Sequence, residues 1–162
     1  MKQKILVLSL VLLFLVTVVS CNDATRGDGK VYTKYLDVYF PSRQADYYED
    51  THGGFHGDGD IFMSFLLNEK EVEKLKADIE ENSNWKTIDE EAWAYLYGGA
   101  EGVYTEGYLQ GWVPEIKSGY FCIYDKQTEN FAFPKKGSYS HNYIAAVCSI
   151  EDKVIYIYGM DT

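Results

Sequence analysis

The chain has 162 residues, 46% hydrophobic and 25% charged, with 25 acids against 15 bases and a formal net charge of −10. This length suits one domain, and its 8 Phe, 15 Tyr and 3 Trp are more apolar material than an intrinsically disordered chain carries. The acidic balance, with no clustered Lys or Arg, disfavours nucleic acid as a partner, because phosphate contacts require clustered basic side chains.

The N-terminal residues have the three-part organisation of an export signal. Lys2 and Lys4 precede an uncharged apolar run over residues 5–19. This run is short for a membrane-spanning helix, which needs about 20 apolar residues, and it matches the apolar core of a secretory signal. The next residues, Val18-Val19-Ser20-Cys21, resemble the lipobox of bacterial lipoproteins, with Ser20 as the small residue and Cys21 as the acylated residue.

This resemblance implies that diacylglycerol is attached to Cys21 and that the chain is cleaved before it. The protein would then be anchored by lipid in the bacterial cell envelope, facing outside the cytoplasm. An ordinary signal peptide and an uncleaved anchor are the alternatives. We therefore expect a signal peptide over residues 1–20, a polar tether over 21–30 and one domain over 31–162. Without Lys2 and Lys4, 13 bases face all 25 acids, so the mature chain carries −12.

Two cysteines remain once Cys21 is set aside. Cys122 and Cys148 lie in apolar, strand-like runs, and a location outside the cytoplasm permits a disulfide between them. The alternative is that each is a buried free thiol, which packs as a small hydrophobic side chain.

The first half of the domain predicts two strands separated by a polar segment. Residues 31–40 alternate, with Tyr32, Leu36, Val38 and Phe40 on one side, which is typical of a strand. A polar, glycine-rich stretch covers residues 42–60. Residues 61–67 then form an apolar run that predicts a more deeply buried strand.

A helix is predicted over residues 69–82. Asn68 and Glu71 match an N-terminal capping box, and Val72, Leu75 and Ile79 recur at helical spacing. Thr87 and Glu90 repeat the capping pattern, and a second short helix is expected to follow and to end at Gly98-Gly99. Residues 98–114 contain five glycines among aromatic residues and predict an ordered loop.

The C-terminal third predicts four further strands, over residues 120–124, 130–133, 142–150 and 153–158. Short polar turns separate them, at residues 125–130 and 151–152. Short connections favour antiparallel pairing. The fold class is therefore α+β, a mostly antiparallel sheet with one long helix on a face and a second short helix.

The densest group of chemically active side chains lies in the glycine-rich stretch 50–60. Imidazole and carboxylate groups in a tightly bending loop suit a divalent metal such as zinc, so a metal-dependent hydrolase is one hypothesis. The alternative is a hairpin whose polar side chains bond its own backbone. The candidate ligands are His52, His56, Asp58 and Asp60.

Two short stretches also resemble segments of small, uncharacterised bacterial lipoproteins. They are His52–Gly59, which reads His-Gly-Gly-Phe-His-Gly-Asp-Gly, and Ile155–Tyr158 before Asp161-Thr162. The resemblance implies no known activity. It indicates that the glycine-rich loop is a feature of the domain itself.

The favoured hypothesis is a non-enzymatic binding or interaction domain with no catalytic residues and no cofactor. An acidic domain attracts basic partners at long range, so a cationic protein is the expected partner, as for an immunity-type lipoprotein that neutralises a toxin. Aromatic side chains provide rigid contact area, although the same residues could instead fill the core. The candidates for a recognition surface are Trp93, Tyr104, Tyr108 and Trp112.

Overall fold

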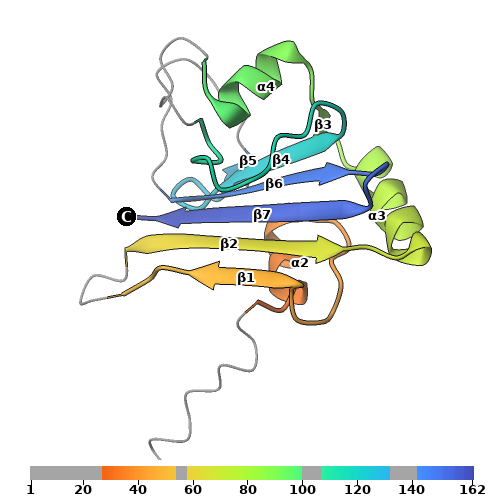
Figure 1. Ribbon diagram of the computed structural model, residues 1–162, viewed down its shortest axis with the longest axis horizontal. Coiled ribbons are helices and arrows are strands. Elements are labelled where there is room, and N and C mark those ends of the chain that lie inside the picture. Colours follow the sequence, from red (N-terminus) through yellow and green to blue (C-terminus); the bar gives the residue numbers. More distant parts are fainter. Residues whose placement is uncertain (1–26, 54–57, 100–106, 132–141) are drawn as a thin grey trace, which may run out of the picture.

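The computed structural model describes residues 27–53, 58–99, 107–131 and 142–162. Within these ranges the chain forms a seven-stranded sheet in which every pairing is antiparallel (Figure 1). The order across the sheet is β1-β2-β7-β6-β4-β3, and β5 pairs with β4. The predicted α+β class is confirmed. The strands are β1 (Tyr47–Asp50), β2 (Gly59–Leu66), β3 (Lys86–Thr87), β4 (Tyr120–Asp125), β5 (Asn130–Phe131), β6 (Tyr143–Ser149) and β7 (Val154–Asp161).

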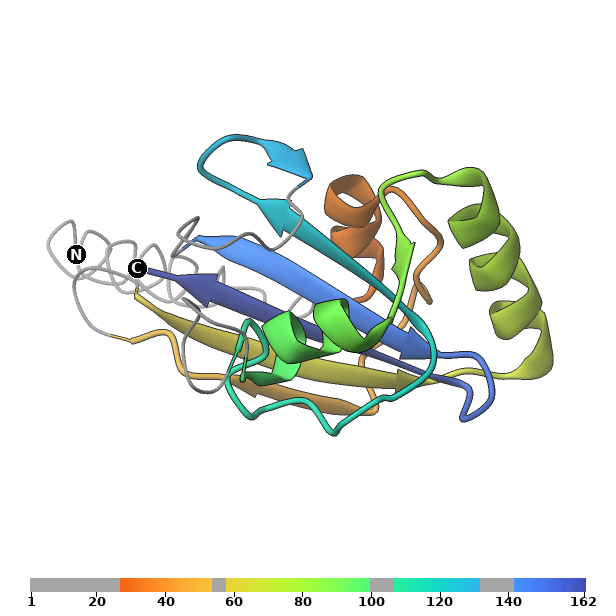
Figure 2. The same cartoon turned by 90° about the horizontal axis from the view of Figure 1, so that it is seen from above.

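Three helices pack around this sheet in the described ranges, so the expectation of one long and one short helix is not confirmed in that detail. They are α2 (Lys30–Leu36), α3 (Glu69–Glu81) and α4 (Glu90–Tyr97). Figure 2 shows α2 and α3 on one face of the sheet and α4 on the other. The longest, α3, has 13 residues. None of the three is both long and apolar enough to cross a membrane.

The predicted strand over residues 31–40 is wrong, because its first half is helix α2. Tyr32 and Leu36 are four residues apart, a spacing that places them on one side of a helix as well as on one side of a strand. Val38 and Phe40 follow in an irregular segment. All four side chains are buried, so the sequence identified the right core residues in the wrong element.

Residues 27–30, which the sequence assigns to the tether, are part of the domain. The Gly29 amide donates to the Arg43 carbonyl at 3.2 Å, and the Ala45 amide donates to the Gly27 carbonyl at 2.8 Å. A Cβ on Gly29 would lie 2.5 Å from the Pro41 carbonyl oxygen, so only glycine permits this approach. The folded domain therefore includes at least these four residues.

Helices α3 and α4 begin at side-chain caps. Asn68 and Glu71 form the predicted capping box, with N–H···O distances of 3.1 and 2.9 Å. For α4 the cap is Asp89 instead of Thr87, since an Asp89 carboxylate oxygen accepts from the Ala92 amide at 2.8 Å. Capping satisfies amides that lack a partner within the first helical turn.

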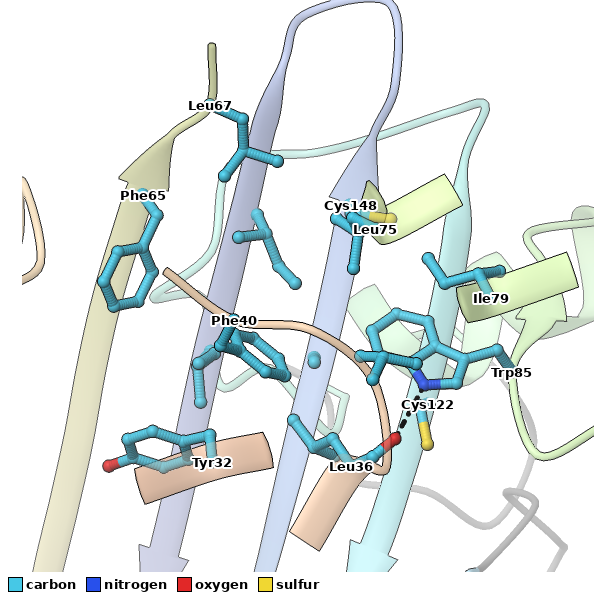
Figure 3. Close-up of a cluster of buried hydrophobic side chains, with 14 of the residues drawn as sticks. Tyr32, Leu36, Phe40, Phe65, Leu67, Leu75, Ile79, Trp85, Cys122 and Cys148 are labelled. Atoms are coloured by element: carbon cyan, nitrogen blue, oxygen red, sulfur yellow. Dashed lines mark hydrogen bonds between the residues drawn. The ribbon is translucent and has the colours of Figure 1, made fainter. Parts of the chain in front are cut away.

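Strand alternation separates two hydrophobic clusters, one on each face of the sheet. The cluster on the α2 and α3 face includes Trp85, whose indole N–H donates to the Leu36 carbonyl at 3.0 Å (Figure 3). The opposite cluster packs beneath α4 and the segment 107–116. Large members of the first cluster are Met63, Phe65, Leu75, Ile155 and Ile157, and those of the second are Leu96, Leu109, Phe121, Ile123 and Tyr158.

Cys122 and Cys148 lie on adjacent strands of the first cluster as free, buried thiols. Cys122 is opposite Ala146, so Cys148 is its diagonal neighbour. Burial raises the pKa of both thiols, that of Cys148 to about 12 even though the Tyr120 amide lowers it in part. The reactive thiolate is therefore scarce at neutral pH.

We expect both thiols to resist a disulfide reagent at pH 8 in the native protein and to react fully in urea. A Cys21→Ser background leaves only these two thiols to be counted. Two thiols titrating at once in the native state would contradict the burial, and none titrating in urea without reductant would show a disulfide.

Candidate functional site

The glycine-rich stretch links β1 to β2, which pair antiparallel, and its residues 54–57 lie outside the described ranges. The Thr51 amide donates to the Asp60 carbonyl at 2.9 Å, and the Asp60 amide donates to the Thr51 hydroxyl at 2.8 Å. A Cβ on Gly59 would lie 2.6 Å from the His52 backbone, so this approach requires glycine. Asp58 is exposed, and His56 lies outside the described residues.

His52 is the centre of a polar network at the end of the sheet. Its Nδ1 lies 2.6 Å from Asp50 Oδ1, and its Nε2 lies 3.3 Å from Asp161 Oδ2. Lys126 Nζ lies 2.5 Å from the other oxygen of Asp161. The Tyr48 hydroxyl donates to Asp50 Oδ2 at 2.9 Å. This His52 network, comprising Tyr48, Asp50, His52, Lys126 and Asp161, joins the ends of β1 and β7 to the turn after β4.

Asp50 is held ionised by this network. Its side chain is only 13% exposed, and burial by itself raises the pKa of the carboxyl group. Hydrogen bonds from the His52 amide, the His52 ring and the Tyr48 hydroxyl outweigh burial, so the pKa of Asp50 is below its usual range. The pKa of the Tyr32 phenol is raised, mainly because the group is buried. Electrostatic interactions with Tyr48 and Asp50 raise it further.

The structure does not bring the predicted metal ligands His52 and Asp60 together. In the β1–β2 register Asp50 is opposite Ile61, so His52 continues the α2 face. Asp60 lies on the α4 face, where one of its carboxylate oxygens accepts from the Tyr158 hydroxyl at 2.6 Å. Side chains adjacent along a strand face opposite ways. Among the described residues, no group of three or more His, Cys, Asp or Glu side chains is placed to hold a metal ion.

The His52 network therefore has the geometry of a structural clamp. Both imidazole nitrogens of His52 already contact carboxylates, Nδ1 that of Asp50 and Nε2 that of Asp161. The network connects three chain segments that are far apart in the sequence, so its main expected effect is on stability.

The four residues of the predicted recognition surface have different surroundings. Tyr108 is 8% exposed and packs edge-on against Tyr143, whose hydroxyl donates to the Tyr108 carbonyl, so it belongs to the core. Trp93 and Trp112 are half-buried. Tyr104 lies outside the described residues. The sequence thus located part of an aromatic surface and included one core residue in it.

Sequence reasoning missed three further members of this surface, which come from strands. The Phe62 ring lies 5.5 Å from Tyr47, 6.1 Å from Tyr156 and 6.2 Å from Trp112, measured between ring centroids. We call these four side chains the aromatic row. Tyr47 is 50% exposed and the other three are half-buried. The alternation of Ile155-Tyr156-Ile157-Tyr158 was the available signal, since it places both tyrosines on one face.

Carboxylates border the aromatic row. Glu49 accepts a hydrogen bond of 2.6 Å from the Tyr47 hydroxyl, which raises the pKa of that phenol. Burial, and then the charge of Asp152, raise the pKa of Tyr156. Burial is also the main cause that raises the pKa of Tyr97 to about 12, with Glu115 as a further contributor, despite the Ile116 amide that lowers it. An added cation would be attracted to this border.

A cavity of about 430 Å³ opens beside helix α4. Ile88 and the Trp93 ring supply its apolar lining, and its polar lining comes from three carboxylates and one lysine, those of Asp89, Glu90, Glu115 and Lys117. Trp93 stacks obliquely on Tyr97, with 5.5 Å between centroids. Its indole N–H is buried without an acceptor in the described part of the chain. Glu115 lines this cavity and also contributes to the raised pKa of Tyr97. The carboxylates that border the aromatic row therefore extend to the cavity.

Comparisons of the chain with protein-family models, with curated proteins and with solved structures found no match.

Proposed function

We propose that this protein is a lipid-anchored lipoprotein of the bacterial cell envelope whose domain binds a basic protein partner without catalysing a reaction. The observation that carries the proposal is the balance of 13 bases and 25 acids after the lipobox. Such an excess of one charge raises the rate at which oppositely charged proteins associate, and salt weakens it. An immunity-type role, in which the domain masks a cationic toxin, is a concrete form of this activity.

Lipid attachment is tested at Cys21. Changing Cys21→Ser in the full chain is expected to abolish incorporation of a labelled fatty acid and to release the protein from the membrane fraction. Cys122→Ala, which leaves the lipobox intact, serves as the control and should keep the label. Label retained in Cys21→Ser would contradict the lipoprotein assignment.

Partner choice is tested with the lipidated protein in nanodiscs of zwitterionic lipid. Small basic proteins and acidic proteins of similar size are offered in turn, and association is followed by surface plasmon resonance. Only basic proteins should bind, and raising the salt concentration from about 50 to 500 mM should slow association at least about tenfold. Binding that is indifferent to salt and to partner charge would overturn the proposal.

A further inference from the structure

We propose that the aromatic row is the docking surface for a cationic protein segment, whose arginine side chains stack on Tyr47, Phe62, Trp112 and Tyr156. This inference rests on the proposed function and names the surface that performs it. The surface lies on the α4 side of the sheet, over β1, β2 and β7. The partner it fits is a basic segment with planar guanidinium groups.

The first step of the argument is that helix α4 covers only part of its face. The buried strand residues of the cluster beneath it come from β4, β6 and β7, whereas Phe62, Trp112 and Tyr156 pack against the border of that cluster and stay partly buried. Figure 1 shows α4 on the β3–β4 side, with no helix of the described chain in front of β1 and β2. There Tyr47 is 50% and Leu66 is 63% exposed. An apolar surface left open at one place, with polar side chains around it, is typical of a binding site.

The second step is that the open surface is built from aromatic side chains in mutual contact. Phe62 and Tyr156 are stacked with 13° between their ring planes, and both come from paired central strands. Tyr47 and Trp112 flank Phe62 from β1 and from the segment after α4. Three of the four rings are held by strands, which preorganises the row, so little conformational entropy is lost when a partner binds. Aromatic residues of this kind dominate binding energy at interfaces.

The third step is charge complementarity. Glu49 accepts a hydrogen bond from Tyr47 at one end of the row. The negative charge of Asp152 contributes to the raised pKa of Tyr156, and that of Glu115 contributes to the raised pKa of nearby Tyr97. Among the described residues that line the Trp93 cavity, Lys117 is the one basic side chain, against three carboxylates. Guanidinium groups bind aromatic faces and carboxylates together. A neutral sugar ring would use the aromatic faces and gain nothing from this excess of negative charge.

The experiment uses the full lipidated protein in zwitterionic nanodiscs, with empty nanodiscs as the background. The probe is a fluorescent peptide of alternating arginine and alanine, and its neutral citrulline counterpart is the matched peptide. Fluorescence anisotropy gives Kd for wild type, for the double variant Glu49→Lys/Glu115→Lys and for the control Glu73→Lys/Glu81→Lys. The control makes the same charge change on exposed positions of α3, on the opposite face.

We expect the arginine peptide to bind wild type and the citrulline peptide to bind far more weakly. Glu49→Lys/Glu115→Lys should raise Kd about tenfold, whereas the α3 control should change it less than about twofold. Tyr47→Ser should weaken binding as well, and Val31→Ala, an exposed truncation on the α2 side, should not.

Equal losses in the two double variants would overturn this docking surface and leave the proposed function standing, because basic peptides would then bind through the overall charge. Failure of wild type to bind the arginine peptide, together with binding of a neutral oligosaccharide, would overturn both the surface and the basic partner.

Discussion

Replacing Phe65 with alanine is expected to lower the free energy of unfolding by about 3–5 kcal/mol, which is a large part of the stability of a domain of this size. Phe65 is fully buried in the cluster beneath α2. The guanidinium carbon of Arg43 lies 5.6 Å from the centroid of the Phe65 ring. On the N-terminal side, Gly29 lies so close that an added Cβ would be 3.1 Å from Cζ of the ring. Truncation would leave a cavity between β2 and the segment around Gly29.

Urea unfolding followed by circular dichroism measures this effect, and Leu66→Ala is the matched control. Leu66 is the next residue on β2 but is 63% exposed on the other face, so its truncation should cost less than about 0.5 kcal/mol. Similar losses in the two variants would contradict the register of β2. A Phe65→Leu variant keeps most of the volume and should retain a measurable transition.

Strands β2, β4, β6 and β7 and helix α3 could be predicted because their signals are local. The box of Asn68 and Glu71 and the apolar spacing that follows them determine α3 without reference to the rest of the chain. Helix α2 could not be predicted in this way, because the i, i+4 pair Tyr32 and Leu36 fits two periods. The short edge strand β1 lies within a polar segment, and only its pairing with β2 makes it a strand.

The candidate site shows the same division between local and long-range information. The sequence pointed to His52 and to Trp112, but it grouped them with their neighbours along the chain. The actual partners of His52 include Asp161, which lies 109 residues away. Phe62 meets Tyr156 only because β2 and β7 pair, and it meets Trp112, which lies 50 residues away along the chain. Such groupings depend on sheet order, which local patterns do not specify.

Asp50→Asn is expected to lower the free energy of unfolding at pH 7 by about 1–3 kcal/mol, because the charged acceptor of the His52 network is lost. The folded pKa of Asp50 is below the unfolded value of about 3.9. Its contribution is therefore fully present above that value and disappears as pH falls through the lower, folded pKa. The difference between wild type and variant should shrink toward zero over this acidic window.

Unfolding in urea at a series of pH values measures the difference, and Asp58→Asn is the control. Asp58 is exposed near the same hairpin, so its variant should differ from wild type by less than about 0.5 kcal/mol at every pH. Adding His52→Gln to Asp50→Asn should cost less than the two single changes suggest, since both remove one contact. A loss that stays constant from pH 7 to the acidic end would show that Asp50 acts through its shape instead of its charge, and would contradict the clamp.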